Sequence, residues 1–380
     1  MGNRKKLALA FPPFSTPTSA PLGVCMLKGY VERSLSDWSV RAIDLNLLTY
    51  RKIFGFMANG RYLDPRAFRE GPLGEIALSR AAEVFSGGND HEFYHRPDRY
   101  TIYADLMLRL AEYEVGNFRY LEAAYKQDGA MPPLVEEYAK VILDEAPDVV
   151  GLSLCYSHQV WIALCIAKAV RRRSSAPILW GGTFFGPHKE QFALEHQGVV
   201  DAIVAGEGEL ALVELLQTLD NPRQVPGVTY VENGEAHSNP PVFEHDLDSL
   251  GHPDFSDLDL NAYYCPSPVV PILTSRGCYW RKCAFCVHYQ SAGQTYRRHS
   301  ISYLLEELSR HVEAGTTHFS LVDEMISPKR FRELAQGILD AGLSIRYYAL
   351  AKPVKQFDSE LLSMMHESGC RYLLLSLIHI

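Results

Sequence analysis

Residues 148–170 read DVVGLSLCYSHQVWIALCIAKAV, and this stretch decides the fold class. Its first part, 148–156, is almost wholly apolar, which is typical of a strand that is buried on both faces. The following segment, 159–173, has apolar residues at helical spacing and ends in arginines, which suit the negative end of a helix dipole. Because Asp148 and Lys168 lie within the stretch, we interpret it as a strand and a helix rather than a membrane span.

The same alternation continues on both sides of this stretch. Strands are predicted at 5–13, 39–46, 176–182 and 201–209, and helices at 21–34, 134–146, 187–197 and 210–219. Apolar strands that alternate with amphipathic helices indicate a parallel sheet covered on both faces. We therefore predict an α/β, Rossmann-like (flavodoxin-like) domain over residues 1–220. Residues 47–130 are aromatic-rich and interrupt the pattern, so we interpret them as a helical insertion.

Small and polar residues follow the predicted strands at their carboxyl ends, where parallel sheets bind ligands. They are Pro12, Pro13, Asp44, Ser153, Gly181, Gly182, Gly206, Glu207, Gly208 and Glu209. Glycine lets a ligand approach the backbone closely, but glycine and proline also turn a chain after any strand. The two glutamates could equally be solvated acids in the first turn of a helix. No G-x-G-x-x-G fingerprint follows the first strand, which disfavours a nicotinamide site.

The second half of the chain also alternates. Residues 227–239 predict a hairpin that turns at Asn233-Gly234, and 221–267 as a whole read as a hairpin and a proline-rich linker. Further strands are predicted at 268–275, 318–324, 344–352 and 370–375, and helices at 300–315, 328–342 and 358–369.

Composition limits the function classes. The chain has 380 residues, 47% of them hydrophobic, and a net charge of −8, which argues against nucleic-acid binding. The N-terminus MGNRKKLALAF lacks the long apolar run of a secretion signal, so we expect a cytoplasmic protein that is not in a membrane. Its eight cysteines are then expected to be reduced, and a cluster of them suggests a metal rather than disulfides.

Three of these cysteines lie in TSRGCYWRKCAFC, residues 274–286, directly after a predicted strand. Cys278, Cys283 and Cys286 have the spacing Cys-x4-Cys-x2-Cys, and thiolates select zinc, copper(I) or iron–sulfur clusters. Structural zinc usually takes four ligands, and no fourth is obvious here. Three thiolates on a 4Fe-4S cluster would leave one iron open for a substrate. The spacing therefore favours a redox cluster, with structural zinc as the alternative.

The stretch TSRGCYWRKCAFC resembles the cluster loop of radical S-adenosylmethionine (SAM) enzymes, especially those with an N-terminal cobalamin-binding domain. An apolar strand, Ser-Arg-Gly-Cys and Phe285 immediately before the last cysteine carry this resemblance. Segments 11–23, 181–192, 201–209 and 226–235 resemble parts of that subfamily's cobalamin domain. The loop departs from the family's commonest spacing, Cys-x3-Cys-x2-Cys, by one extra residue. The Asp-x-His-x-x-Gly motif of some cobalamin domains is absent, so no histidine is nominated as the lower cobalt ligand.

The resemblance implies a 4Fe-4S cluster, SAM and cobalamin as cofactors. SAM would be cleaved reductively to methionine and a 5′-deoxyadenosyl radical, and cobalamin would relay a methyl group. The expected reaction is methyl transfer to a natural product, a peptide or a cofactor precursor, with electrons from a flavodoxin or ferredoxin. The alternatives are a radical SAM reaction without cobalamin, such as cyclisation or sulfur insertion, and a non-catalytic cobalamin- or nucleotide-binding protein with a zinc loop.

The resemblance also implies a partial β/α (TIM-like) radical SAM barrel over residues 268–374 and assigns candidate contacts. Those for SAM are Phe285, Asp323, Glu324 and Lys352. Those for cobalamin are Pro12, Pro13, Leu22, Gly23, Ser153, Gly181, Gly182, Gly206, Glu207 and Gly208. Asp323 and Glu324 could equally be acids exposed after a strand.

The last six residues, 375–380, read LSLIHI, which is the translation of CTGTCTCTTATACACATC, a transposon end used in sequencing libraries. We interpret them as adaptor sequence. On this interpretation the chain is a C-terminally truncated fragment that lacks the later barrel strands, and we expect the fragment itself to be inactive.

Overall fold

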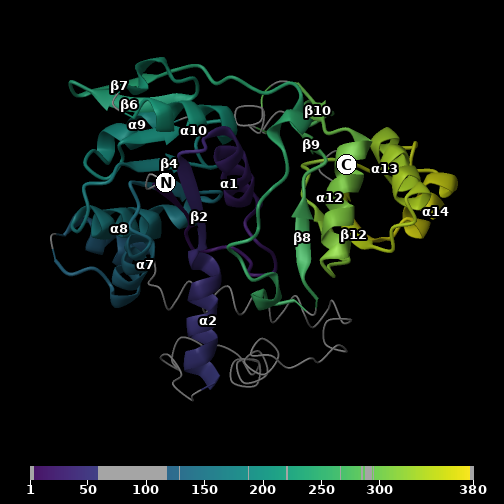
Figure 1. Cartoon of the computed structure of the whole chain (residues 1–380), viewed down its shortest axis with the longest axis horizontal. Coiled ribbons are helices and arrows are strands. Elements are labelled where there is room, and N and C mark those ends of the chain that lie inside the picture. The colour runs from purple at the N-terminus through teal and green to yellow at the C-terminus, as the bar shows by residue number, and fades with distance from the viewer. Residues whose placement is uncertain are drawn as a thin grey trace.

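A computed structural model describes residues 4–58, 118–127, 129–186, 188–219, 221–265, 267–283, 286, 293 and 295–376 (Figure 1). Most of the predicted insertion, 47–130, lies outside the described residues, as does the candidate SAM contact Phe285. The described parts form an N-terminal α/β half and a C-terminal β/α half, joined by an extended linker (Figure 1).

The N-terminal half has one sheet in the order β2-β1-β3-β4-β5-β6-β7 among the described residues. Its strands are β1 (Lys5–Phe11), β2 (Trp38–Asp44), β3 (Val149–Ser153), β4 (Ile178–Gly181), β5 (Ala202–Val204), β6 (Val228–Glu232) and β7 (Glu235–Ser238). Strands β1 to β5 pair in parallel, as predicted. The predicted hairpin, β6-β7, adds antiparallel strands to the same sheet, because Ile203 pairs with Thr229.

Helices cover both faces of this sheet, which confirms the predicted Rossmann-like architecture. They are α1 (Leu22–Ser34), α2 (Leu45–Ala58), α6 (Phe118–Lys126), α7 (Pro133–Asp144), α8 (Val160–Arg171), α9 (Lys189–Glu195) and α10 (Gly208–Gln217). Successive strand residues point to opposite faces. Ala8 and Ala10 therefore pack in one core cluster with α7 and α8, whereas Leu7 and Leu9 pack in a second cluster with α1 and α10.

The C-terminal half consists of βα units. Strands β8 (Val269–Ile272), β11 (His318–Leu321), β12 (Arg346–Ala351) and β13 (Cys370–Leu375) form a parallel sheet in the order β13-β12-β11-β8. The intervening helices are α12 (Ile301–Glu313), α13 (Pro328–Asp340) and α14 (Ser359–Glu367). Ser300, Ser327 and Asp358 cap them by accepting backbone N–H bonds. This arrangement is the predicted start of a β/α barrel.

The linker, residues 239–268, contains two short 3-10 turns, Leu247–Leu250 and Leu260–Ala262. Two further 3-10 turns, Ser157–Gln159 and Pro222–Gln224, lie in the N-terminal half. Buried Lys28 of α1 holds the linker by ion pairs to Asp257 (2.8 Å) and Asp254 (3.4 Å). Without these carboxylates the buried Lys28 ammonium would lack compensation, so the two pairs fix where the linker runs.

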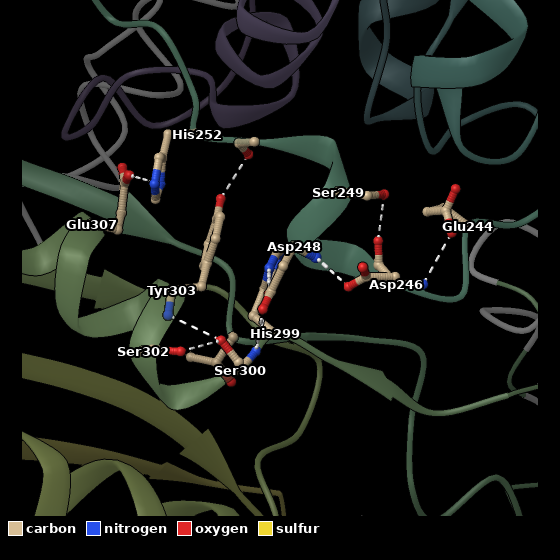
Figure 2. Close-up of polar contacts among 12 residues, drawn as sticks. Glu244, Asp246, Asp248, Ser249, His252, His299, Ser300, Ser302, Tyr303 and Glu307 are labelled. Carbon is tan, nitrogen blue, oxygen red and sulfur yellow. Dashed lines mark hydrogen bonds and ion pairs between the residues drawn. The ribbon is translucent and has the colours of Figure 1, made fainter.

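At the other end the linker contacts the start of α12 through three stacked rings (Figure 2). Tyr303 lies between His252 and His299, with ring centroids 4.4 and 4.1 Å away. Asp248 Oδ1 is 3.0 Å from His299 Nδ1, and Glu307 Oε2 is 2.5 Å from His252 Nδ1. The stack therefore docks the linker onto the C-terminal half.

One hydrophobic core cluster continues across the two halves. It includes Leu9 and Leu212 from the N-terminal sheet and α10, Phe255 from the linker, and Ile272 and Phe331 from the barrel units. This shared apolar core fixes the strand ends of one half relative to the loops of the other. No helix in the described part of the chain is both long and apolar enough to cross a bilayer.

Asp44, at the end of β2, has an unusual environment for a carboxylate. It accepts hydrogen bonds from the Leu47 backbone N–H (2.8 Å) in α2 and from the Tyr263 hydroxyl (2.7 Å) in the linker. Burial raises the pKa of Asp44 to about 6, although these hydrogen bonds oppose the rise. The folded state therefore binds the proton on the Asp44 carboxyl more tightly than the unfolded state does. The contribution of Asp44 to the free energy of unfolding is greatest below about pH 4 and falls as pH rises through about 6.

We predict that Asp44→Asn, which keeps the side-chain shape but cannot ionise, removes this pH dependence. Relative to the wild type, the variant should gain up to about 3 kcal/mol in free energy of unfolding between pH 4 and pH 7. Urea unfolding of both proteins across this range measures the difference. A stability difference that stays constant with pH would contradict a raised pKa at Asp44.

Candidate functional site

A cavity of about 480 Å³ lies where the carboxyl ends of the N-terminal strands face the barrel units. Eight of the ten candidate cobalamin contacts line it: Leu22, Gly23, Ser153, Gly181, Gly182, Gly206, Glu207 and Gly208. The parallel strands place these residues together because each follows a strand or begins the next helix. A volume of this order is typical of small-molecule and cofactor pockets.

Pro12 and Pro13 are not among the residues that line this cavity. The Pro12 carbonyl accepts a hydrogen bond from the buried Gln159 side chain (2.6 Å). Gln159 also binds the Cys155 and Tyr156 N–H groups through its Oε1. The structure thus gives Pro12 a contact that orders the loops after β1 and β3.

Gly182 is required by the fold itself. Its φ is +100°, and a Cβ there would lie 2.1 Å from the Leu154 carbonyl oxygen. This close approach brings the ends of β3 and β4 together and forms part of the cavity wall. By contrast, a Cβ on Gly23 would have no neighbour within 4 Å, so Gly23 leaves open space in the wall.

Most of the cavity wall is apolar, with Leu9, Leu179 and Val204 on the sheet side. Hydroxyl and amide groups also line the cavity, from the loops and from the first turn of α2: Ser15, Thr16, Ser19, Asn46, Thr183 and Tyr156. A mainly apolar wall with a few polar groups is typical of sites that bind small organic ligands and cofactors. The sequence patterns had not singled out this polar set, because Ser and Thr in loops are commonplace.

The barrel units close the opposite side of the cavity. Ser275, Arg276 and Gly277 line it, together with Glu324 after β11. Gly277 directly precedes Cys278, so the cavity reaches the start of the cysteine loop. A ligand in the N-terminal half would therefore lie next to this loop.

Buried ion pairs join the two halves at this wall. Arg276 Nη1 is 3.1 Å from Glu209 Oε2 and 3.2 Å from Glu207 Oε2, and Arg276 Nη2 also pairs with Glu209 Oε1. Arg297 Nη1 is 2.9 Å from Glu207 Oε2. Each of these four side chains is at most 10% exposed. The alternative that Glu207 and Glu209 are solvated acids is therefore wrong.

The charges in this set support one another. Burial alone would raise the pKa of Glu209, but the Arg276 guanidinium more than offsets it and holds that pKa below its usual value. Burial would likewise lower the pKa of Arg276, but Glu209 and Glu207 raise it above its usual value. Glu209 and Arg276 therefore stay ionised at neutral pH, as a buried, hydrogen-bonded pair requires.

A short ladder closes the base of the cysteine loop. Strand β9 (Ser275–Arg276) pairs antiparallel with β10 (Arg297–Arg298), and the cysteines lie between them. Gly277 has φ +82°, and a Cβ there would lie 2.7 Å from the Thr295 carbonyl oxygen. The loop therefore leaves the ladder through a turn that favours glycine.

Asp323, a candidate SAM contact, anchors this base. Its carboxylate accepts hydrogen bonds from Thr274 N (2.9 Å), Thr274 Oγ1 (2.8 Å) and Ser275 Oγ. Buried Arg330 donates to the carbonyls of His299 (2.6 Å) and Thr274 (3.3 Å). Asp323 is 1% exposed and is not among the cavity-lining residues, whereas its neighbour Glu324 is.

The cysteine loop carries free thiols at all three predicted positions. Cys278 and Cys283 are half-buried, Cys286 is exposed, and Cys286 N donates to the Cys283 carbonyl (3.2 Å). The thiols do not converge: within the described residues, no three Cys, His, Asp or Glu side chains are placed to bind one metal ion. The donor set fits an iron–sulfur cluster in its chemistry, and binding one would require the loop to bring the thiols together.

Lys352, the remaining candidate SAM contact, directly follows β12 and contacts this loop. Its ammonium lies over the Trp280 ring, and Lys282 lies over the same ring at 5.1 Å. The contact joins the third described barrel strand to the cysteine loop through a cation–π interaction.

Comparisons with known proteins agree with this geometry. Residues 103–216 match the B12 binding domain family. The chain is 29% identical over 245 residues to an uncharacterized methyltransferase of Pyrococcus horikoshii, covering 62% of this chain and 52% of the relative. It is 31% identical over 244 residues to the hopanoid C-3 methylase of Methylococcus capsulatus, covering 60% and 45%. The chain thus spans about half the length of these curated relatives.

Two solved structures share its fold. One is the cobalamin-dependent SAM radical enzyme OxsB, with aqua-cobalamin and SAM bound. The match covers 99% of this chain and 44% of the OxsB chain, with a TM-score of 0.65 and 17% sequence identity. Another is the radical SAM methyltransferase TsrM of Kitasatospora setae, with cobalamin and a 4Fe-4S cluster bound. The match covers 98% of this chain and 59% of the TsrM chain, with a TM-score of 0.59 and 17% sequence identity. The resemblance expected from the sequence is therefore confirmed: this chain contains a B12-binding domain match and has the fold of cobalamin-dependent radical SAM enzymes.

Proposed function

We propose that this protein is a cobalamin-dependent radical SAM methyltransferase. The observation that carries the proposal is the cavity, which joins the strand ends of the half that matches a B12-binding domain to the residue preceding three clustered cysteines. Relatives named as methyltransferases, from Pyrococcus horikoshii and Methylococcus capsulatus, support methyl transfer as the reaction class.

Residues of this chain would hold the cofactors in two adjoining places. Cys278, Cys283 and Cys286 would bind a 4Fe-4S cluster, and the cavity would bind cobalamin against Gly181 and Gly208. Once bound, the cluster would supply an electron for reductive cleavage of SAM, and cobalamin would supply a methyl carrier. The apolar wall would exclude water from the space between them, which protects reactive chemistry from side reactions.

For SAM, we retain Glu324 and Lys352 as candidate contacts. Glu324 lines the cavity on the barrel side, and Lys352 lies at the cysteine loop. Asp323 is proposed instead as a residue that positions the loop base, because its oxygens already bind Thr274 and Ser275. Phe285 stays a prediction from the sequence.

The substrate is proposed to be a small molecule or a peptide, and the electron donor a flavodoxin or ferredoxin. The TsrM structure with tryptophan bound supports a small substrate for enzymes of this fold. Arg281 and Lys282, both exposed on the cysteine loop, would suit an acidic donor surface.

The cluster assignment can be tested by anaerobic reconstitution with iron and sulfide. We expect about four irons and four sulfides per chain and an electron-spin signal that SAM alters. Cys283→Ala should abolish the signal because it removes a ligand. Cys265→Ala, which removes a half-buried thiol outside the loop, should retain it. One zinc per chain without such a signal would contradict a redox cluster and favour a zinc loop.

The cobalamin assignment can be tested by filling the cavity. Gly23→Phe puts a ring into open space in the wall, so it should weaken hydroxocobalamin binding at least about tenfold. Gly129→Phe is the matched control, because Gly129 also has open space around its Cβ but does not line the cavity. Binding is followed by visible absorbance and folding by thermal melting. Equal affinity in the two variants would argue against cobalamin in this cavity.

A further inference from the structure

The two strands that close the cysteine loop each carry an arginine, and these arginines face one another. In the β9-β10 ladder, Arg276 is the direct partner of Arg297. Like charges opposite each other destabilise an antiparallel pair. A ladder of only two residues on each strand is held mainly by contacts from outside it, and on the barrel side these come from Asp323 and Arg330. The closure of the loop also depends on what neutralises the two guanidinium groups.

The neutralising carboxylates come from the other half of the molecule. At the start of α10, Glu207 pairs with both arginines and Glu209 pairs with Arg276, although these partners lie 67 to 90 positions apart in sequence. Arg297 also donates to the Glu244 carbonyl (2.5 Å) in the linker. Because these groups are buried, losing one carboxylate would leave a buried cation without full compensation. The base of the loop is thus held by the B12-binding half.

The same side chains face the cavity. Glu207, Glu209 and Arg276 all line it, so a ligand there would lie against the ion pairs. A ligand that displaces water lowers the local dielectric, and ion pairs and hydrogen bonds then become stronger. Filling the cavity should therefore tighten the ladder and restrain Cys278, two residues after Arg276.

We propose that Glu207 and Glu209 are positioning residues for the cysteine loop, which hold its base against the cavity so that a ligand filling the cavity tightens the loop. The identification of this ligand as cobalamin rests on the proposed function. The coupling is reciprocal: ordering of the loop by bound metal would raise the affinity of the cavity for its ligand by the same factor.

The positioning role can be tested on the ligand-free chain by site-resolved thiol alkylation. Glu209→Gln keeps the side-chain shape but removes the charge that Arg276 needs, so Cys278 should be alkylated about fivefold faster than in the wild type. Glu232→Gln is the matched control, because it removes the carboxylate of an exposed ion pair with Arg223 away from the cavity. Cys165, fully buried in α8, serves as the internal reference and should not change.

Two further measurements separate positioning from general loosening. Glu209→Asp keeps a carboxylate that Arg276 can pair with, so alkylation of Cys278 should stay slower than in Glu209→Gln. Hydroxocobalamin should slow alkylation of Cys278 in the wild type and in Glu232→Gln, but much less in Glu209→Gln.

Equal ligand-free rates in Glu209→Gln and Glu232→Gln would overturn the inference, as would a parallel rise at Cys165. If no variant binds hydroxocobalamin, the cobalamin assignment and its coupling to the loop both fail. In that case the ligand-free rates still decide the positioning role, so failure of the proposed function is distinguishable from failure of this inference.

Discussion

The structure depends on one constraint: the base of the cysteine loop is held from two sides. From the barrel side, buried Asp323 binds Thr274 and Ser275, which immediately precede the loop. From the other half, Glu209 pairs with Arg276. The contact between Glu209 and Arg276 could not be kept if the two halves moved apart. The loop that carries the candidate cluster ligands is therefore positioned by both halves at once.

This constraint follows from the topology. The carboxyl ends of parallel strands form the ligand edge of a sheet, and here two such edges face each other across the cavity. A shared hydrophobic core, which includes Leu212 and Ile272, fixes the edges in place. The buried ion pairs contribute specificity of arrangement more than net stability, because burial of the charges costs much of what their attraction gains. They can form only when the two edges are correctly aligned.

Features with local signals could be predicted from the sequence. The alternation of apolar strands and amphipathic helices predicted where the strands lie. The short spacing of the three cysteines predicted a metal loop, and the position of Gly181, Gly206 and Gly208 at or just after strands predicted the ligand edge of the sheet. The roles of Asp323 and Arg297 could not be predicted, because their partners lie 49 and 90 positions away and no local pattern indicates them. Pro12 was expected at the ligand because it follows a strand, but a strand end places a residue near the edge without deciding which way it faces.

In the proposed arrangement, cobalamin and an iron–sulfur cluster occupy adjoining sites, and Arg276 pairs with Glu209 between the halves. The most direct measurement is a crystal structure of the chain reconstituted with both cofactors, with anomalous scattering recorded at the cobalt and iron edges. We expect cobalt in the cavity lined by Gly181 and Gly208, iron at Cys278, Cys283 and Cys286, and an intact ion pair between Arg276 and Glu209. Cobalt outside this cavity, or Arg276 turned away from Glu209, would contradict this arrangement.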